Sequence, residues 1–128
     1  MDGVLLDTQI VYLAYRGEMQ KISRAARESI DNPETIRLVS AVYIIEIAVK
    51  YAIGKVDMDE HAVRNAIRDL RLTELAFEPR HAFRMFLLPL HHRDPFDRMI
   101  LATAVAEKLP IVTGDRIFRR YSEVKVIW

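Results

Sequence analysis

Two short runs of apolar residues in this chain each lead to an aspartate. The run Val4–Leu6 is followed directly by Asp7, and the run that starts at Ile111 is followed by a glycine and then Asp115. A run that is apolar at every position is typical of a strand covered on both faces, as in a parallel sheet. In such sheets ligands bind beyond the carboxyl ends of the strands. We therefore expect Asp7 and Asp115 to lie close together at one edge of a sheet.

Strand and helix patterns alternate along the rest of the chain. Strands are predicted over Val4–Leu6, Ile36–Val39, Leu72–Phe77, Ile111–Thr113 and Val124–Ile127. Helices are predicted over Thr8–Tyr15, Met19–Ile30, Ala41–Ile53 with Ser40 as its cap, Asp59–Leu70, Pro79–Phe86, Asp94–Lys108 and Arg116–Tyr121. This alternation predicts an α/β fold, a three-layer α/β/α domain with a mainly parallel central sheet. A length of 128 residues suits a single domain over residues 1–128.

Composition excludes several classes of function. Hydrophobic residues make up 51% of the chain and charged residues 29%, which is typical of a globular domain with a real core. The chain has no cysteine, so disulfides, zinc–thiolate sites and cysteine nucleophiles are excluded. The net charge is only +1, so any surface for nucleic acid has to be local. No apolar stretch matches a membrane span and the start of the chain does not resemble a signal peptide, so we expect a cytoplasmic protein with no membrane partner.

Two further carboxylates lie at positions where a core residue would be expected. Glu46 lies within the apolar run Ala41–Val49. Asp97 lies in the first turn of a predicted helix, on the stripe that continues with Leu101. Buried carboxylates are costly unless they are paired, protonated or bound to a metal. Four carboxylates that converge would form an oxygen-rich site of the kind that binds Mg²⁺ or Mn²⁺.

Each of these carboxylates also has a purely structural explanation. Asp7 and Asp115 each precede a predicted helix and could act as its N-cap. Asp94, which is followed by a proline, is a favourable N-cap for the next helix. Lys50 lies four residues after Glu46, so the two could form an ordinary surface ion pair. The pattern of residues leaves both explanations open.

Basic residues lie next to two of the acidic segments. The loop His91–Arg93 precedes one acidic helix, and Arg116 follows Asp115. Both groups could be solvated surface, or they could contact the phosphate oxygens of a nucleic acid.

Several segments together resemble one known family, the PIN-domain proteins, and within it the VapC-type toxins of bacterial and archaeal toxin–antitoxin pairs. The segments that carry the resemblance are Leu5–Thr8, Ser40–Lys50, His91–Arg98, Leu109–Asp115 and Val126–Trp128, in the order of the family. The run His-Arg-Asp-Pro-Phe-Asp-Arg at residues 92–98 is the most specific of them. One departure is Gln9, where this branch of the family often has a histidine.

The resemblance implies a metal-dependent endoribonuclease that hydrolyses RNA with a metal-activated water. The acidic quartet of the family, which is implied to be catalytic and to bind Mg²⁺ or Mn²⁺, falls on Asp7, Glu46, Asp97 and Asp115. Contacts to the substrate are implied for Thr8, Arg93, Asp94, Thr113 and Arg116. The resemblance also implies a cognate VapB-like antitoxin as partner and a homodimer.

Large apolar side chains on two predicted helices fit the implied homodimer. They are Tyr12, Leu13 and Tyr15 on the first helix and Tyr43, Ile47 and Tyr51 on the helix of Glu46. Because this is more apolar surface than one small sheet needs, we expect these side chains to form an interface.

Three other functions share part of this pattern. A receiver domain also has an acidic magnesium pocket in an α/β fold, but it needs adjacent acids after the first strand, where this chain has Thr8 and Gln9. A nuclease of the PIN fold that acts on DNA usually carries larger insertions than 128 residues allow. A PIN module that only binds would lack one of the four acids, and all four are present.

Overall fold

A parallel sheet forms the centre of the computed structural model, which describes residues 3–128. Within these residues its five strands are β1 (Gly3–Leu6), β2 (Ile36–Ser40), β3 (Thr73–Leu75), β4 (Ile111–Val112) and β5 (Val126–Ile127), in the order β3-β2-β1-β4-β5. Leu5 of β1 pairs with Leu38 of β2 on one side and with Ile111 of β4 on the other. The strand order reverses at β1, which is the place where open α/β sheets bind ligands.

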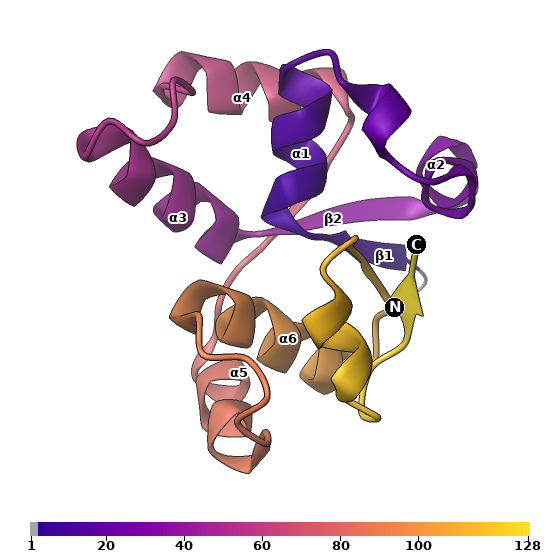
Figure 1. The fold of residues 1–128 in the computed structure, drawn as a ribbon, viewed down its shortest axis with the longest axis vertical. Coiled ribbons are helices and arrows are strands. Elements are labelled where there is room, and N and C mark those ends of the chain that lie inside the picture. The colour runs from indigo at the N-terminus through magenta and orange to yellow at the C-terminus, as the bar shows by residue number, and fades with distance from the viewer. Residues whose placement is uncertain (1–2) are drawn as a thin grey trace.

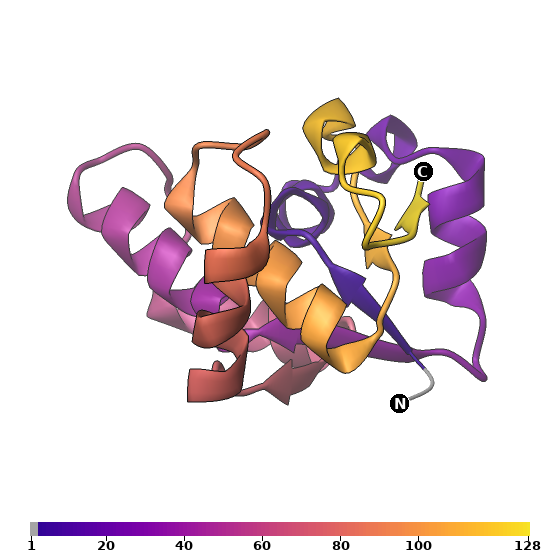
Figure 2. The same ribbon diagram turned by 90° about the horizontal axis from the view of Figure 1, so that it is seen from below.

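Helices cover both faces of this sheet (Figures 1 and 2). The α-helices are α1 (Thr8–Tyr15), α2 (Arg24–Asp31), α3 (Ala41–Ala52), α4 (Glu60–Asp69), α5 (Pro79–Arg84) and α6 (Pro95–Glu107). Short 3₁₀ helices are η1 (Met19–Lys21), η2 (Met85–Leu87) and η3 (Arg116–Arg120). In Figure 1, α1, α2 and α4 lie above the strands and α5 and α6 lie below them. The predicted three-layer α/β/α fold with a parallel sheet is confirmed.

The apolar cores explain why the first strand is hydrophobic at every position. Val4 and Leu6 of β1 pack with α1, α2, α3 and α4 on one face of the sheet. Leu5, between them, points to the opposite face and packs with α6 and η3. Since successive side chains of a strand point to opposite faces, a strand between two helical layers has to be apolar throughout.

The prediction of one helix over Met19–Ile30 is wrong. Ile22 has an extended backbone, with φ of −89° and ψ of 133°, and its side chain is buried in the core. The Ser23 hydroxyl then accepts a hydrogen bond from the backbone N–H of Ala26, which starts α2 as a new helix. Serine favours the N-cap over the helix interior for this reason.

The expected interface residues are divided between the core and the surface. Leu13, Tyr43 and Ile47 lie in the core, so the prediction that they form a dimer surface is wrong. Tyr12 is partly buried, and Tyr15 and Tyr51 are exposed. Helix α3 carries apolar side chains on nearly all sides. Those on its inner face pack on the core, and the others remain exposed to solvent.

None of the helices within residues 3–128 combines the length and the apolar character needed to cross a membrane.

Candidate functional site

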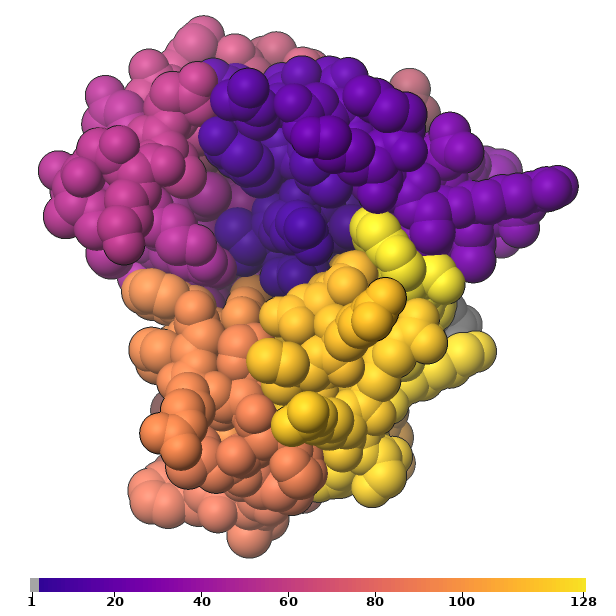
Figure 3. Space-filling view, viewed as in Figure 1, coloured from indigo at the N-terminus to yellow at the C-terminus, as the bar shows by residue number. Residues whose placement is uncertain are grey.

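A cavity of about 520 Å³ lies at the carboxyl ends of β1 and β4, where the strand order reverses. Its lining is acidic, with five carboxylates and one lysine: Asp7, Glu46, Lys50, Asp94, Asp97 and Asp115. In the space-filling view of Figure 3, the indigo start of the chain is set back between the magenta, orange and yellow segments that carry the other acids. The four carboxylates predicted from the sequence to converge therefore lie around one cavity.

Asp7 is buried and follows β1 directly. Although Asp7 occupies the N-cap position of α1, its side chain makes no capping hydrogen bond. Its Oδ2 instead accepts a hydrogen bond of 2.7 Å from the hydroxyl of Thr113, which follows β4. Burial raises the pKa of Asp7 to about 6 from an ordinary value of 3.8; the Thr113 hydrogen bond opposes this rise and repulsion from Glu46 adds to it. The capping explanation for Asp7 is therefore excluded.

Glu46 projects from α3 and is buried, and both of its oxygens have partners. Oε1 accepts a hydrogen bond of 2.7 Å from the Thr8 hydroxyl, and Oε2 lies 2.6 Å from Nζ of Lys50. Burial lowers the pKa of Lys50, but the hydrogen bond to Glu46 and the nearby carboxylates of Asp94 and Asp97 raise it by more, so the net shift is upward. The ion pair expected from the i, i+4 spacing is present, but it lines the cavity instead of lying on open surface.

The first turn of α6 carries two of the acids. Oδ1 of Asp94 accepts hydrogen bonds from the backbone N–H groups of Phe96 and Asp97, so Asp94 is the N-cap of this helix. Asp97 is the third residue of the helix and lies in its first turn. Burial, followed by repulsion from Asp7 and then from Asp94, raises the pKa of Asp97 to about 8. Asp97 therefore carries a proton at neutral pH in the protein without a cation.

Asp115 has both a capping contact and a contact in the site. Its Oδ1 caps η3 by accepting a hydrogen bond of 3.0 Å from the N–H of Ile117. Its Oδ2 lies 3.3 Å from Nε2 of His92. The preceding Gly114 packs against the indole of Trp128, where a Cβ would come within 2.8 Å of the ring. Capping therefore accounts for Oδ1 of Asp115, whereas Oδ2 remains available in the acidic cavity.

The sequence prediction missed His92 as a site residue. Its side chain is buried, and Nε2 lies 2.8 Å from Oδ2 of Asp97 and 3.3 Å from Oδ2 of Asp115. The signal available in the sequence was the position of this histidine in the specific run that contains Asp97, but the pattern did not distinguish it from the neighbouring His91.

The residues expected to contact a substrate lie at different depths. Thr8 and Thr113 are buried and direct their hydroxyl groups at carboxylates, so they position Glu46 and Asp7. Arg93 and Arg116 are exposed. Asp94 lines the cavity while it caps α6.

This donor set fits a divalent cation. Carboxylates from four separate segments line one cavity, and burial, with added repulsion from neighbouring carboxylates, raises the pKa values of Asp7 and Asp97. A hard divalent ion such as Mg²⁺ or Mn²⁺ prefers such oxygen ligands and would remove that repulsion. Asp7, Asp97 and Asp115 are the residues that would hold it.

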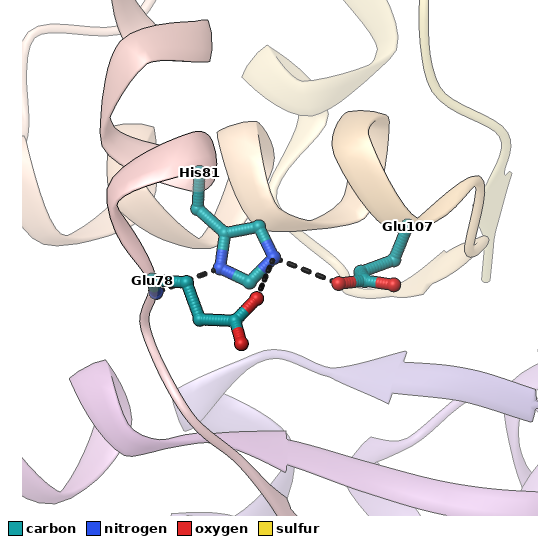
Figure 4. Close-up of side chains that lie close together, drawn as sticks. All are labelled: Glu78, His81 and Glu107. Atoms are coloured by element: carbon teal, nitrogen blue, oxygen red, sulfur yellow. Dashed lines mark hydrogen bonds and ion pairs between the residues drawn. The ribbon is translucent and has the colours of Figure 1, made fainter.

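A second cluster of acidic and histidine side chains joins α5 to α6 (Figure 4). The buried His81 accepts a hydrogen bond at Nδ1 from the N–H of Glu78, and its Nε2 lies 2.8 Å from Oε1 of Glu107. Arg80 makes ion pairs with both glutamates. Because Nδ1 is an acceptor, the proton of the neutral ring is on Nε2 and is donated to Glu107. The cluster is a hydrogen-bonded clamp between α5 and α6, to which Arg80 adds ion pairs.

An apolar groove of about 570 Å³ lies between α3 and α4. Its apolar lining includes Ile44, Tyr51, Met58 and Val63, and Ile47 lines both this groove and the acidic cavity. Charged side chains also line the groove: Asp59, Glu60, Arg64, Arg68 and Glu74.

Comparisons with known proteins identify the fold through solved structures and the family through a sequence model. A solved structure of VapBC2 from Rickettsia felis bound to a DNA fragment from its promoter matches with a TM-score of 0.71 and 18% identity, over 96% of this chain and 96% of that one. A structure of DNA-bound VapBC from Salmonella typhimurium matches with a TM-score of 0.71 and 20% identity, over 98% of this chain and 97% of that one. A search of curated protein sequences gives no significant match. The sequence model of the PIN domain matches residues 4–124. The chain therefore belongs to the PIN domain family.

Proposed function

We propose that this protein is a divalent-metal-dependent endoribonuclease of the VapC type, the toxin of a toxin–antitoxin pair. The observation that carries the proposal is the convergence of Asp7, Glu46, Asp97 and Asp115 on one cavity at the switch point of the sheet. The resemblance of this chain to VapC-type toxins and its membership of the PIN domain family support the same activity.

In this proposal each acidic residue has a separate part. Asp7, Asp97 and Asp115 bind Mg²⁺ or Mn²⁺, and Glu46 completes the site or orients the attacking water. A bound divalent ion supplies Lewis acidity and makes water a better nucleophile at neutral pH. Thr113 fixes the orientation of Asp7, while Thr8 and Lys50 fix that of Glu46.

The exposed arginines Arg93 and Arg116 supply positive charge next to an otherwise acidic cavity. An RNA backbone needs such charge, because the carboxylates alone would repel its phosphates. We therefore assign both arginines to substrate binding.

A VapB-like antitoxin is the proposed partner. The two similar solved structures are complexes of VapBC proteins. The groove between α3 and α4 is lined largely by apolar side chains, and Ile47 lines both this groove and the acidic cavity. An amphipathic segment in this groove, with a basic residue that reaches the carboxylates, would exclude RNA from the site.

The test is cleavage of matched nucleic acids by the purified chain. We expect it to cut single-stranded RNA in Mg²⁺ or Mn²⁺ and to lose this activity in excess chelator. The Asp97→Asn variant is expected to fold, because the change removes repulsion among the carboxylates, and to be inactive, because it lacks one ligand. Equal cleavage of RNA with and without chelator would overturn the proposal. Cleavage of single-stranded DNA of the same sequence, with RNA left intact, would favour a DNA nuclease of the same fold.

A further inference from the structure

The loop before α6 is fixed by contacts with two side chains, those of Tyr121 and Arg98. The Tyr121 hydroxyl accepts hydrogen bonds from the backbone N–H groups of His91 (3.1 Å) and His92 (2.8 Å) and donates one to the Pro89 carbonyl (2.7 Å). The guanidinium of Arg98 donates hydrogen bonds to the carbonyls of Pro89 and His92. These contacts leave the backbone at His92 little freedom to move.

The His92 ring is held in one orientation. The imidazole ring and the ring of Phe118 pack in a T-shaped arrangement, with their planes nearly perpendicular and their centroids 5.5 Å apart. Nδ1 accepts a hydrogen bond of 3.3 Å from the backbone N–H of Asp94. A ring nitrogen that accepts a hydrogen bond carries no proton, so the proton of the neutral ring lies on Nε2.

The protonated nitrogen of His92 lies between two carboxylates. Nε2 is 2.8 Å from Asp97 and 3.3 Å from Asp115, and it makes no hydrogen bond of good geometry with either. His81 offers a contrast within the same chain, because its Nε2 makes a hydrogen bond of 2.8 Å with one carboxylate, that of Glu107, while the carboxylate of Glu78 lies farther away at 3.9 Å. His92 is only 8% exposed and its Nε2 is fully buried; because a buried N–H is costly to leave unpaired, its position between two acceptors requires an explanation.

Direct binding of a metal by His92 does not explain this position. A histidine that binds a metal through Nε2 carries its proton on Nδ1 and donates it to a neighbouring acceptor. Here Nδ1 faces a backbone N–H, which is a donor. The ring is therefore built to donate from Nε2 and not to bind an ion there.

We propose that His92 is a positioning residue, which holds the carboxylates of Asp97 and Asp115 in register by presenting its Nε2–H to both. The two acids belong to separate segments, α6 and the turn after β4, and His92 contacts both of them. By holding Oδ2 of Asp97 next to Oδ2 of Asp115, the ring keeps both carboxylates turned toward the site and leaves Oδ1 of Asp97 to face the cation, while Oδ1 of Asp115 caps η3. This inference rests on the proposed metal site.

The first test measures Mn²⁺ binding to the full chain by electron paramagnetic resonance. His92→Leu removes the donor, His92→Gln restores an N–H near the position of Nε2, and His61→Leu on exposed α4 is the matched control. Loss of such a supporting contact typically weakens metal binding about ten- to hundred-fold, and we expect this for His92→Leu. His92→Gln should recover most of the affinity, and His61→Leu should bind like the wild type.

The outcomes separate this inference from the proposed function. If the wild type binds Mn²⁺ and His92→Leu binds it with the same affinity, the positioning role is overturned and the metal site stands. Absence of Mn²⁺ binding in the wild type overturns both proposals. Equal losses in His92→Leu and His92→Gln also count against the role of the N–H.

A second measurement does not depend on the folding of any variant. Long-range ¹H–¹⁵N nuclear magnetic resonance of the wild type reports which ring nitrogen is protonated. We expect Nε2–H in the metal-free protein and also in the protein with Mg²⁺. A proton on Nδ1 in the presence of Mg²⁺ would identify His92 as a direct ligand and would overturn the proposal.

Discussion

The carboxylates of the cavity differ in how neighbouring residues compensate their charge. Glu46 has a lysine and a hydroxyl as partners. Asp97 lies among other carboxylates, and burial together with their repulsion raises its pKa to about 8. In the metal-free protein a proton therefore neutralises Asp97, and a cation has to displace that proton. Metal affinity is thus expected to rise with pH up to about 8.

The pKa of Asp97 also predicts how stability depends on pH. Its folded pKa of about 8 exceeds the ordinary value of 3.8, so the folded state binds more protons than the unfolded state between these two values. The free energy of unfolding therefore falls as pH rises through this window. Asp97→Asn removes the group, so the variant should be increasingly more stable than the wild type from pH 5 to pH 8, without metal.

Melting temperatures of the two metal-free proteins, measured side by side at each pH, test this prediction. The comparison cancels the titration of all groups that both proteins share. Curves that stay parallel from pH 5 to pH 8 would show that Asp97 is not held protonated.

The sequence was sufficient to predict which carboxylates converge, but it did not reveal their supporting contacts. Asp7 and Asp115 follow buried strands, and parallel strands bring their ends to one edge whatever their distance in the chain. His92 depends on Tyr121, which lies 29 residues further along the chain and fixes the loop by its hydroxyl. Such a contact between loops has no periodicity, so no pattern in the sequence indicates it.

At the level of elements, the N-terminus of α6 connects helix stability with the site. Asp94 caps this helix, and Asp97 lies in its first turn. Asp94→Ala should lower the free energy of unfolding by about 1 kcal/mol and reduce cleavage, because the turn that carries Asp97 loosens. Asp94→Ser keeps a capping oxygen and should retain most of both. Urea unfolding and RNA cleavage measure the two effects, and an Asp94→Ser variant as inactive as Asp94→Ala would instead indicate a direct contact with the substrate.

The turn after β4 depends on a close approach between Gly114 and Trp128. A Cβ at Gly114 would lie 2.8 Å from the indole ring, and the backbone there is not left-handed, so crowding is the main cost of a side chain. We expect Gly114→Ala to destabilise the protein by about 1–3 kcal/mol. In a Trp128→Ala background the same change should cost much less. A double-mutant cycle by urea unfolding measures this coupling, and equal costs in both backgrounds would refute it.

Element boundaries were harder to predict than element types. The stretch Met19–Ile30 has helical periodicity, but a buried Ile22 and a capping Ser23 divide it. The predicted strand Ile111–Thr113 ends at Val112, and the hydroxyl of Thr113 donates a hydrogen bond to Asp7. At Ser23 a side-chain hydrogen bond competes with the regular backbone structure, which local propensity does not reveal.

At the scale of the whole molecule, the apolar surfaces that residues 3–128 leave outside the cores include two of particular interest. One is the groove between α3 and α4, which we assign to the antitoxin. The other, here called the α5 patch, lies on α5, η2 and the loop after them and consists of Phe83, Phe86, Leu87 and Leu90. Figures 1 and 2 place α5 and the outer part of α3 toward the same side of the molecule. On α3, Ile45 and Val49 are exposed as well.

We expect the α5 patch to hold the proposed homodimer together. Phe86 is 85% exposed and its ring stacks on that of Phe83 with centroids 6.4 Å apart, so a contiguous aromatic surface meets solvent in the single chain. Surfaces of this kind mark interfaces, and a two-fold pairing would cover the patch with its own copy.

Phe86→Glu places a charge in the patch without disturbing the core, and sedimentation at micromolar concentration should change from dimer to monomer. Tyr15→Glu on α1, outside the patch, should leave the dimer intact. A wild-type chain that sediments only as a monomer would remove the homodimer, and a monomer produced by Tyr15→Glu but not by Phe86→Glu would move the interface to α1.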